Sequence, residues 1–168
     1  MATMTTETTP TTAEALTVDD LRVYFETPRG PVKAVDGVTF TLQPGERFGL
    51  VGESGSGKST IALALLRLIK PPGRIVGGQI RLGHDEILSL PEREMRAVRM
   101  ARIAFIPQGA MNSLNPVTRI KQQIIDAMRA HGLDGSKTDL ERRVGDLLAS
   151  VGLRRDVAER YPHELSGG

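Results

Sequence analysis

The chain has 168 residues, enough for one domain with a substantial hydrophobic core, and it contains no cysteine. The lack of cysteine excludes disulfides and thiolate metal sites in this sequence and fits a reducing cytosol. The formal net charge is only +2, and Lys and Arg are interspersed with Asp and Glu, so no basic stripe indicates a nucleic-acid-binding protein.

The first 15 residues are rich in threonine and lack the positive segment and the apolar run of a signal peptide. They predict a disordered tail over residues 1–15, followed by the folded part over residues 16–168. The longest apolar run, residues 61–69, is interrupted by Arg67 and is far shorter than the roughly 20 residues of a membrane-spanning helix. We therefore expect any association with a membrane to go through a partner.

The front of the folded part has the composition of a small antiparallel β unit. Its apolar segments are rich in β-branched and aromatic residues, and clusters of proline and glycine separate them. Strands are predicted over residues 16–25, 32–35, 38–42 and 47–51, with turns over residues 27–31 and 43–45.

The segment that follows matches the phosphate-binding pattern G-x-x-x-x-G-K-[ST]. In order, its residues are Gly52, Glu53, Ser54, Gly55, Ser56, Gly57, Lys58, Ser59 and Thr60. Glycines take positive φ angles and carry no Cβ, so the backbone N–H groups can turn inward onto the α- and β-phosphates of a nucleotide. Lys58 adds a positive charge for the β- and γ-phosphates, and the Ser59 hydroxyl is placed to ligate Mg²⁺.

The surroundings of this loop favour a nucleotide site over a fortuitous glycine-rich turn. The short apolar strand over residues 47–51 precedes it, and residues 61–69, which are apolar on all sides, predict a buried helix after it. The N-terminus of that helix would direct its positive end at the phosphates.

After the helix, a Pro-Pro-Gly sequence ends the helical pattern, and a further strand is predicted over residues 75–82, where Gly77 and Gly78 mark a bulge or bend. A helix with proline in its first turn, a short buried strand and an irregular segment follow, and then two amphipathic helices. These elements are predicted over residues 91–100, 103–106, 107–116, 120–131 and 139–151, respectively. The last helix has an apolar stripe of Val144, Leu147, Leu148 and Val151, whereas His84, His131 and His163 show no ligand spacing and stay unassigned.

Gln108 follows the predicted strand over residues 103–106. A polar side chain at the carboxyl edge of a parallel sheet lies in the crevice where ligands bind, so Gln108 is a candidate to reach Mg²⁺ or an attacking water. The alternative is an ordinary solvated loop residue. At the other end of the chain, a serine and two glycines stand where a helix is expected to begin, which is a weak phosphate-binding signal by itself.

Taken together, residues 16–168 resemble the nucleotide-binding subunit of an ATP-binding-cassette (ABC) transporter. The phosphate loop matches the family's Walker A motif, Gln108 its Q-loop glutamine, and Leu165, Ser166, Gly167 and Gly168 its signature motif. Phe25, with Tyr24 as second choice, stands where the family has its adenine-stacking aromatic residue. The resemblance implies an α/β P-loop NTPase fold, with an antiparallel β unit, part of a parallel core sheet and a helical subdomain.

The resemblance also implies ATP and Mg²⁺ as ligands, with Ser59 and Gln108 on the metal. The expected partners are transmembrane permease subunits, a second ATP-binding subunit of the same or a different chain and, indirectly, an extracytoplasmic solute-binding protein. No nucleic acid is expected. Such a subunit lies in the cytoplasm, attached to the inner face of the cell membrane through its permease.

Two short segments resemble the oligopeptide and dipeptide importers within the family. They are the Ser-Leu-Asn-Pro sequence of residues 113–116 and the Tyr-Pro-His-Glu sequence of residues 161–164. This branch usually has an aspartate after the Q-loop glutamine, where this chain has Gly109. Nickel importers share much of the pattern, so the resemblance leaves a peptide and a metal chelate open as cargo.

The 168 residues include no apolar strand that ends in Asp-Glu (Walker B), no D-loop and no switch histidine. No catalytic residue is therefore assigned, and we expect Mg·ATP binding without turnover, in a marginally stable and aggregation-prone domain. One alternative is a non-hydrolysing protein that occupies the permease or the partner ATPase. Another, an ATPase of DNA repair or chromosome structure, is disfavoured because the chain has neither heptads nor cysteines.

Overall fold

The computed structural model describes residues 15–107, 109 and 113–165. The chain divides into two compact units, Met1–Arg99 and Met100–Gly168. In the described part of the chain, no helix is long and apolar enough to cross a membrane.

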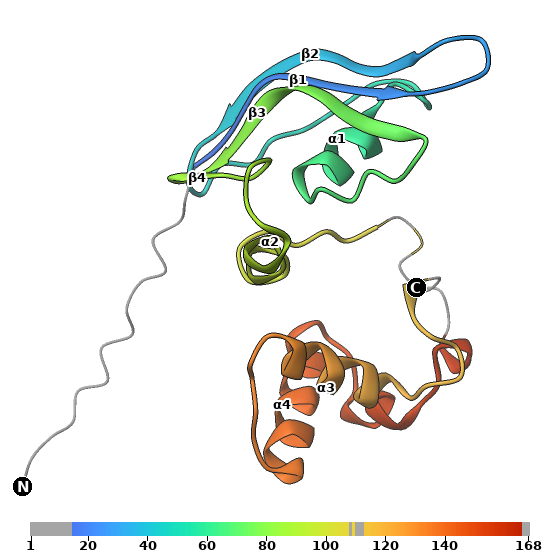
Figure 1. Ribbon diagram of the computed structural model, residues 1–168. Helices are drawn as coiled ribbons and strands as arrows, with labels where there is room; N and C mark the ends of the chain where they lie inside the picture. The colour runs from blue at the N-terminus through green and yellow to red at the C-terminus, as the bar shows by residue number, and fades with distance from the viewer. Residues whose placement is uncertain (1–14, 108, 110–112, 166–168) are drawn as a thin grey trace, which may run out of the picture. The chain divides into compact units, whose positions relative to one another are not determined.

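The first unit is built on an antiparallel sheet of four strands in the order β2-β1-β3-β4 (Figure 1). The strands are β1 (Leu16–Phe25), β2 (Val32–Leu42), β3 (Gly73–Leu82) and the short β4 (Asp85–Glu86). The predicted strand over residues 16–25 is confirmed, and the two predicted over residues 32–35 and 38–42 form one continuous strand. β3 begins two residues before its predicted start, directly after the Pro-Pro pair.

The bulge predicted at Gly77 and Gly78 is present. Asp19 pairs with Gln79 and Arg22 pairs with Gly77, so two residues of β1 lie opposite Gly78 alone. Gly78 has a φ of 94°, and a Cβ built on it would lie 2.5 Å from the carbonyl oxygen of Asp20. Only glycine fits this close approach of two backbones.

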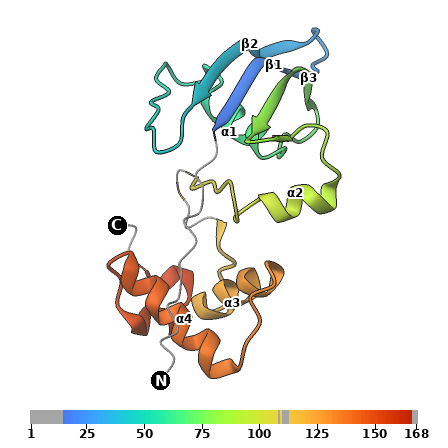
Figure 2. The same cartoon turned by 90° about the vertical axis from the view of Figure 1, so that its left-hand side faces the viewer.

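Helix α1 (Lys58–Leu65) lies on one face of the sheet, and both views show it on the same side of β1, β2 and β3 (Figures 1 and 2). Ile61 and Ala64 are its buried residues, and the sheet contributes buried residues such as Leu21 and Val23. The predicted buried helix over residues 61–69 therefore exists, but it begins at Lys58 and ends four residues earlier than expected. Helix α2 (Glu92–Val98) confirms the helix predicted over residues 91–100 and buries Met95 and Val98.

Two segments predicted as buried strands, residues 47–51 and 103–106, are not strands in this structure. Val51 is 91% exposed and Ile106 is 88% exposed. A parallel strand is stable only with hydrogen-bonded neighbours and with layers covering both faces. No described strand pairs with either segment, which accounts for the two wrong predictions. Within residues 47–51, the Phe48 ring stacks on Phe40 of β2 with centroids 5.0 Å apart.

The second unit contains helices α3 (Ile120–Ala130) and α4 (Lys137–Ser150), followed by the short 3-10 helices η2 (Arg155–Glu159) and η3 (Pro162–Glu164). Both predicted amphipathic helices are confirmed, and Figure 2 shows them together in this unit. Their core consists of Ile120, Ile125, Met128, Leu140, Val144, Leu148 and Val157.

The apolar stripe predicted for α4 is only half right. Val144 and Leu148 are buried, together with Leu140 one turn earlier, but Leu147 and Val151 are exposed. Leu140, Val144 and Leu148 follow one another at intervals of four residues and form one row along the helix, and Leu147 and Val151 lie beside this row. α4 packs mainly against α3 and η2. The buried stripe is therefore narrower than the apolar one.

Candidate functional site

The glycine-rich loop over residues 52–57 connects the exposed segment of residues 47–51 to the first residue of α1. Gly52, Gly55 and Gly57 have φ angles of 155°, 83° and 88°. Other residues rarely adopt such angles, so the glycines set the path of the loop. Gly57 is the N-cap of α1, no side chain caps the helix, and no acidic residue lies in its first turn. The positive end of the helix dipole therefore faces the loop without compensation.

Gly57 also lies directly against strand β2. A Cβ built on it would be 2.3 Å from the carbonyl oxygen of Ala34 and 3.5 Å from Cγ2 of Val35. No real Cβ approaches a backbone oxygen so closely, so the end of the loop can rest on the sheet only because position 57 is glycine. The sequence pattern of the loop requires a glycine at position 57, but nothing in the sequence indicates that this glycine contacts Ala34.

The side chain of Lys58 folds back over the loop. Its Nζ donates hydrogen bonds to the carbonyl oxygens of Gly52, at 2.8 Å, and Glu53, at 2.6 Å, and to Oγ of Ser56, at 3.1 Å. A backbone bond from the N–H of Ser56 to the oxygen of Glu53 closes the same turn. The loop thus holds a positive charge at its centre, as a site for an anion requires.

Backbone donors are also available at this end of α1. The first helical bond runs from the N–H of Ile61 to the oxygen of Gly57. The N–H groups of Lys58, Ser59 and Thr60 have no acceptor within the described residues. A row of free N–H groups beside an ammonium group matches the oxygens of a di- or triphosphate. The residues present therefore fit the phosphates of a nucleotide.

A divalent cation would depend on Ser59 in this region. The described residues contain no group of His, Cys, Asp or Glu that could hold a metal ion. Ser59 is exposed at the first turn of α1 and offers one hydroxyl oxygen. A Mg²⁺ ion held by such a site keeps most of its ligands as water and phosphate oxygens, which is the usual arrangement for this metal.

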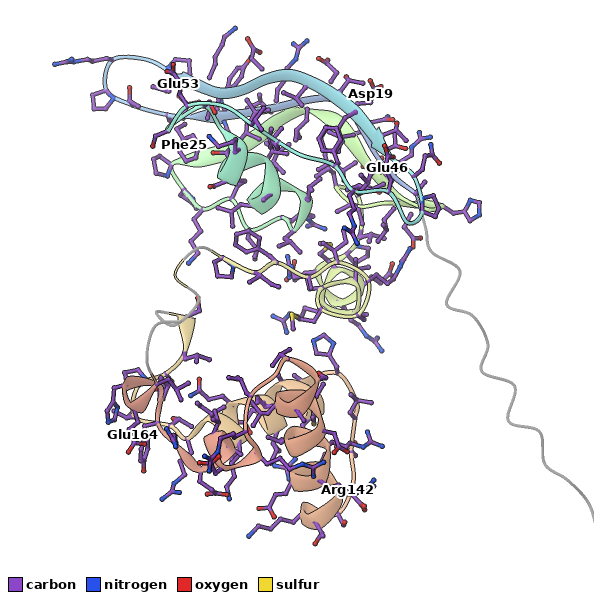
Figure 3. All side chains as sticks on the ribbon, turned by 180° about the vertical axis from the view of Figure 1, so that it is seen from behind. Asp19, Phe25, Glu46, Glu53, Arg142 and Glu164 are labelled. Carbon is purple, nitrogen blue, oxygen red and sulfur yellow. The ribbon has the colours of Figure 1, made fainter. Side chains whose placement is uncertain are left out.

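The structure distinguishes the two aromatic candidates for base stacking. By strand alternation, Phe25 shares the face of β1 that carries the buried Val23, and α1 covers this face. The Phe25 ring lies over Gly73 and is half-buried. In Figure 3, Phe25 and Glu53 of the loop lie at the same end of the first unit, away from Asp19 and Glu46.

Tyr24 points to the other face of the sheet and is already engaged there. Its hydroxyl donates to Oδ1 of Asp36 at 2.6 Å, and Nζ of Lys33 lies 5.4 Å from its ring centroid while donating to Oδ2 of Asp36 at 3.1 Å. The hydrogen bond from Tyr24, followed by that from Lys33, lowers the pKa of Asp36. Phe25 is thus the aromatic side chain on the same face as α1 and the phosphate loop.

The remaining predicted site residues are Gln108 and the four residues of the signature motif. Gln108 and the signature residues Ser166, Gly167 and Gly168 lie outside the described residues. Leu165 belongs to the second unit, where it packs against the helical core and its N–H donates to the oxygen of Pro162.

Comparison with known proteins gives consistent matches over most of the chain. The model of the family described as "ABC transporter" matches residues 35–168. The chain is 45% identical over 156 residues to the oligopeptide transport ATP-binding protein OppD of Salmonella typhimurium, covering 91% of this chain and 46% of that protein. It is 40% identical over 156 residues to the dipeptide transport ATP-binding protein DppD of Escherichia coli, covering 91% and 47%. The chain spans about half the length of the curated relatives it matches.

Solved structures agree in fold. The dimeric structure of MJ0796, a bacterial ABC transporter cassette, superposes with a TM-score of 0.78 at 22% identity, covering 90% of this chain and 63% of that chain. A bacterial Atm1-family ABC exporter with ATP bound gives a TM-score of 0.62 at 23% identity, covering 93% and 25%.

Proposed function

This chain belongs to the ABC transporter family, and on that premise we propose that it binds Mg·ATP at residues 52–60 as part of the ATP-binding subunit of a peptide importer. The membership confirms the family resemblance found in the sequence. The cassette fold of the MJ0796 structure confirms the predicted class, a P-loop NTPase of which the chain covers only part.

The observation that carries the proposal is the cradle formed by the loop and the start of α1. Lys58 holds its ammonium group among loop oxygens, and the N–H groups of the first turn of α1 are free to donate. When bound, Mg·ATP would supply a transferable γ-phosphoryl group. The residues of this chain orient it: the N–H groups donate to phosphate oxygens, Lys58 neutralises charge, and the Ser59 hydroxyl ligates the cation.

Peptide import is supported by relatives that are 45% and 40% identical to this chain and are named as oligopeptide and dipeptide transport ATP-binding proteins. By the same reasoning, the partners are a transmembrane permease, which holds the subunit at the inner face of the membrane, and an extracytoplasmic solute-binding protein that delivers the cargo. A second ATP-binding subunit is supported by the dimeric assembly of the MJ0796 cassette.

Titration with ATP tests the nucleotide site and the role of Phe25 together. Residues 1–168 are expected to bind ATP more tightly with Mg²⁺ than without it. Phe25→Ala is expected to weaken this binding about tenfold, because a stacked base is worth about 1–3 kcal/mol. Tyr24→Ala is the matched control and is expected to change the affinity less than about twofold, since its bonds go to Asp36. A larger loss in Tyr24→Ala than in Phe25→Ala would show that the base stacks on the other residue.

Uptake measurements in the source organism test the cargo. Deletion of the encoding gene is expected to abolish uptake of a radiolabelled tripeptide and to leave uptake of ⁶³Ni²⁺ unchanged. Restoring the natural gene should restore peptide uptake, and restoring it with Lys58→Ala should not. Loss of nickel uptake with intact peptide uptake would show that the cargo is a metal chelate rather than a peptide. The proposal for the nucleotide site would still stand.

A further inference from the structure

Among the residues that the structure describes, no strand pairs with the outer side of β3 over most of its length. β4 has two residues and pairs only with Arg81 and Leu82 at the end of β3. Over residues 74–79, β3 is hydrogen-bonded to β1 on one side. Apart from β1, no described residue makes a hydrogen bond to the backbone of this stretch. The other side of the strand therefore has backbone N–H and C=O groups free for a further strand.

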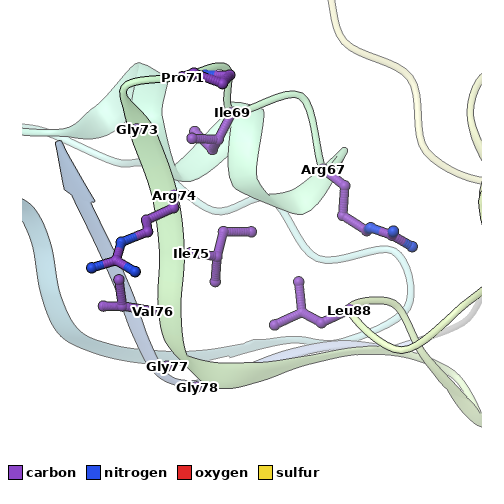
Figure 4. A pocket seen from close by; sticks show the side chains of 10 residues that line it. All are labelled: Arg67, Ile69, Pro71, Gly73, Arg74, Ile75, Val76, Gly77, Gly78 and Leu88. Carbon is purple, nitrogen blue, oxygen red and sulfur yellow. The ribbon is translucent and has the colours of Figure 1, made fainter. Parts of the chain in front are cut away.

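A groove of about 600 Å³ runs along this edge. Residues 73–78 are all among its lining residues, although side chains of successive strand residues point to opposite faces. The groove therefore follows the edge of β3 rather than one face of the sheet. Figure 4 shows Ile75 and Leu88 directed into the groove and Val76 on the opposite side of the strand. Its volume lies within the range that holds small ligands or a few residues of a peptide.

The groove contains an arginine with spare donors. Nη1 of Arg67 donates to the oxygens of Ile87, at 3.3 Å, and Leu90. Within the described residues, Arg67 has no carboxylate within ion-pair distance, and its Nε and Nη2 have no acceptor. The nearby Glu92 is bound to Arg99, at 2.7 Å. No lining residue is acidic, so the groove has a half-buried positive charge that carbonyl oxygens solvate but do not neutralise.

These features match one kind of occupant. An extended peptide satisfies a strand edge by backbone hydrogen bonds, apolar side chains of the peptide can contact Ile69, Ile75 and Leu88, and a carboxylate can pair with Arg67. We propose that the groove beside β3 is a docking site for an extended segment of a partner protein, which adds a strand to the sheet and places a carboxylate on Arg67. The lining residues of the groove include none of the phosphate-loop residues 52–60, and the proposal does not depend on the proposed transport function.

Synthetic heptapeptides test the proposal on residues 1–168. The probe is the capped peptide Thr-Val-Thr-Asp-Thr-Val-Thr, and its matched control has Asn in place of Asp. The Asp peptide is expected to shift the amide NMR signals of residues 74–79 and to bind about tenfold more tightly than the Asn peptide, the difference made by one charge-assisted pair. In Arg67→Gln, which keeps a donor for the loop oxygens, the two peptides are expected to bind equally.

Two further variants test whether the peptide binds in the groove or elsewhere on the sheet. Ile75→Glu, which would place a carboxylate in the groove, is expected to weaken binding of the Asp peptide about tenfold or more by charge repulsion, whereas Arg81→Gln, outside the groove, leaves it unchanged. ATP affinity is expected to be the same in all three variants. No shift of residues 74–79 at millimolar peptide, or equal binding of the two peptides to the natural sequence, would overturn the proposal. So would a concentration-dependent dimer that Ile75→Glu abolishes, because the occupant of the edge would then be a second copy.

Discussion

Gly57→Ala is expected to lower the free energy of unfolding of the first unit by about 2–5 kcal/mol and to abolish detectable ATP binding. Two costs act at this position. The φ of 88° is unfavourable for any residue with a Cβ, and the new Cβ would lie 2.3 Å from the carbonyl oxygen of Ala34. Since that oxygen belongs to the backbone of β2, the loop must move away from the sheet. Urea unfolding followed by circular dichroism measures the first effect, and ATP titration measures the second.

Gly45→Ala is the matched control for the stability effect. Gly45 has a similar φ, 78°, but a Cβ built there would have no atom within 4 Å. This substitution carries only the backbone cost, about 1 kcal/mol, and should leave ATP affinity unchanged. If the two variants lose equal stability, the contact between Gly57 and Ala34 does not constrain the loop.

The elements that the sequence predicted well are those fixed by local interactions. The β-branched run over residues 16–25 forms β1, and the helices α3 and α4 lie where the apolar periodicity placed them. The bulge at Gly78 also follows from a local signal, because two adjacent glycines inside a strand pattern mark a close approach of backbones.

The failures concern segments whose structure depends on distant neighbours. Residues 47–51 and 103–106 have the composition of buried strands, but composition does not supply the strands that must pair with them. The stripe on α4 failed for a related reason. Leu147 and Leu148 are equally apolar, and only the position of α3 and η2 decides that Leu148 is buried and Leu147 is half exposed.

In the candidate site, too, local features could be predicted from the sequence and features that depend on distant neighbours could not. The loop pattern predicted the glycines, Lys58 and Ser59 as one local unit, because the roles proposed for them depend on the backbone between them. The preference for Phe25 over Tyr24 came from the family resemblance, because the two residue types by themselves do not separate the candidates. Adjacent strand residues face opposite sides, and only the position of α1 shows which side carries the phosphate loop.

Lys58→Ala is expected to weaken ATP binding about 10- to 150-fold, because it removes a charged group whose hydrogen bonds to phosphate are worth about 1.5–3 kcal/mol. The loop loses its own bonds as well, since Nζ of Lys58 holds the oxygens of Gly52 and Glu53 and the hydroxyl of Ser56. Isothermal titration with ATP measures the affinity. Lys70→Ala, an exposed lysine of the same unit beyond α1, is the control and should bind ATP like the natural sequence.

The loss can be assigned to the missing charge or to a disordered loop by comparing two further measurements. Lys58→Arg keeps the charge but replaces a compact ammonium group by a larger planar one, which does not fit the same three acceptors. If the fit inside the loop matters, Lys58→Arg should lose nearly as much affinity as Lys58→Ala. Titration with AMP isolates the phosphate contact: AMP lacks the β- and γ-phosphates, so Lys58→Ala should weaken AMP binding far less than ATP binding. An equal loss for both nucleotides would mean that Lys58 acts only by holding the loop together.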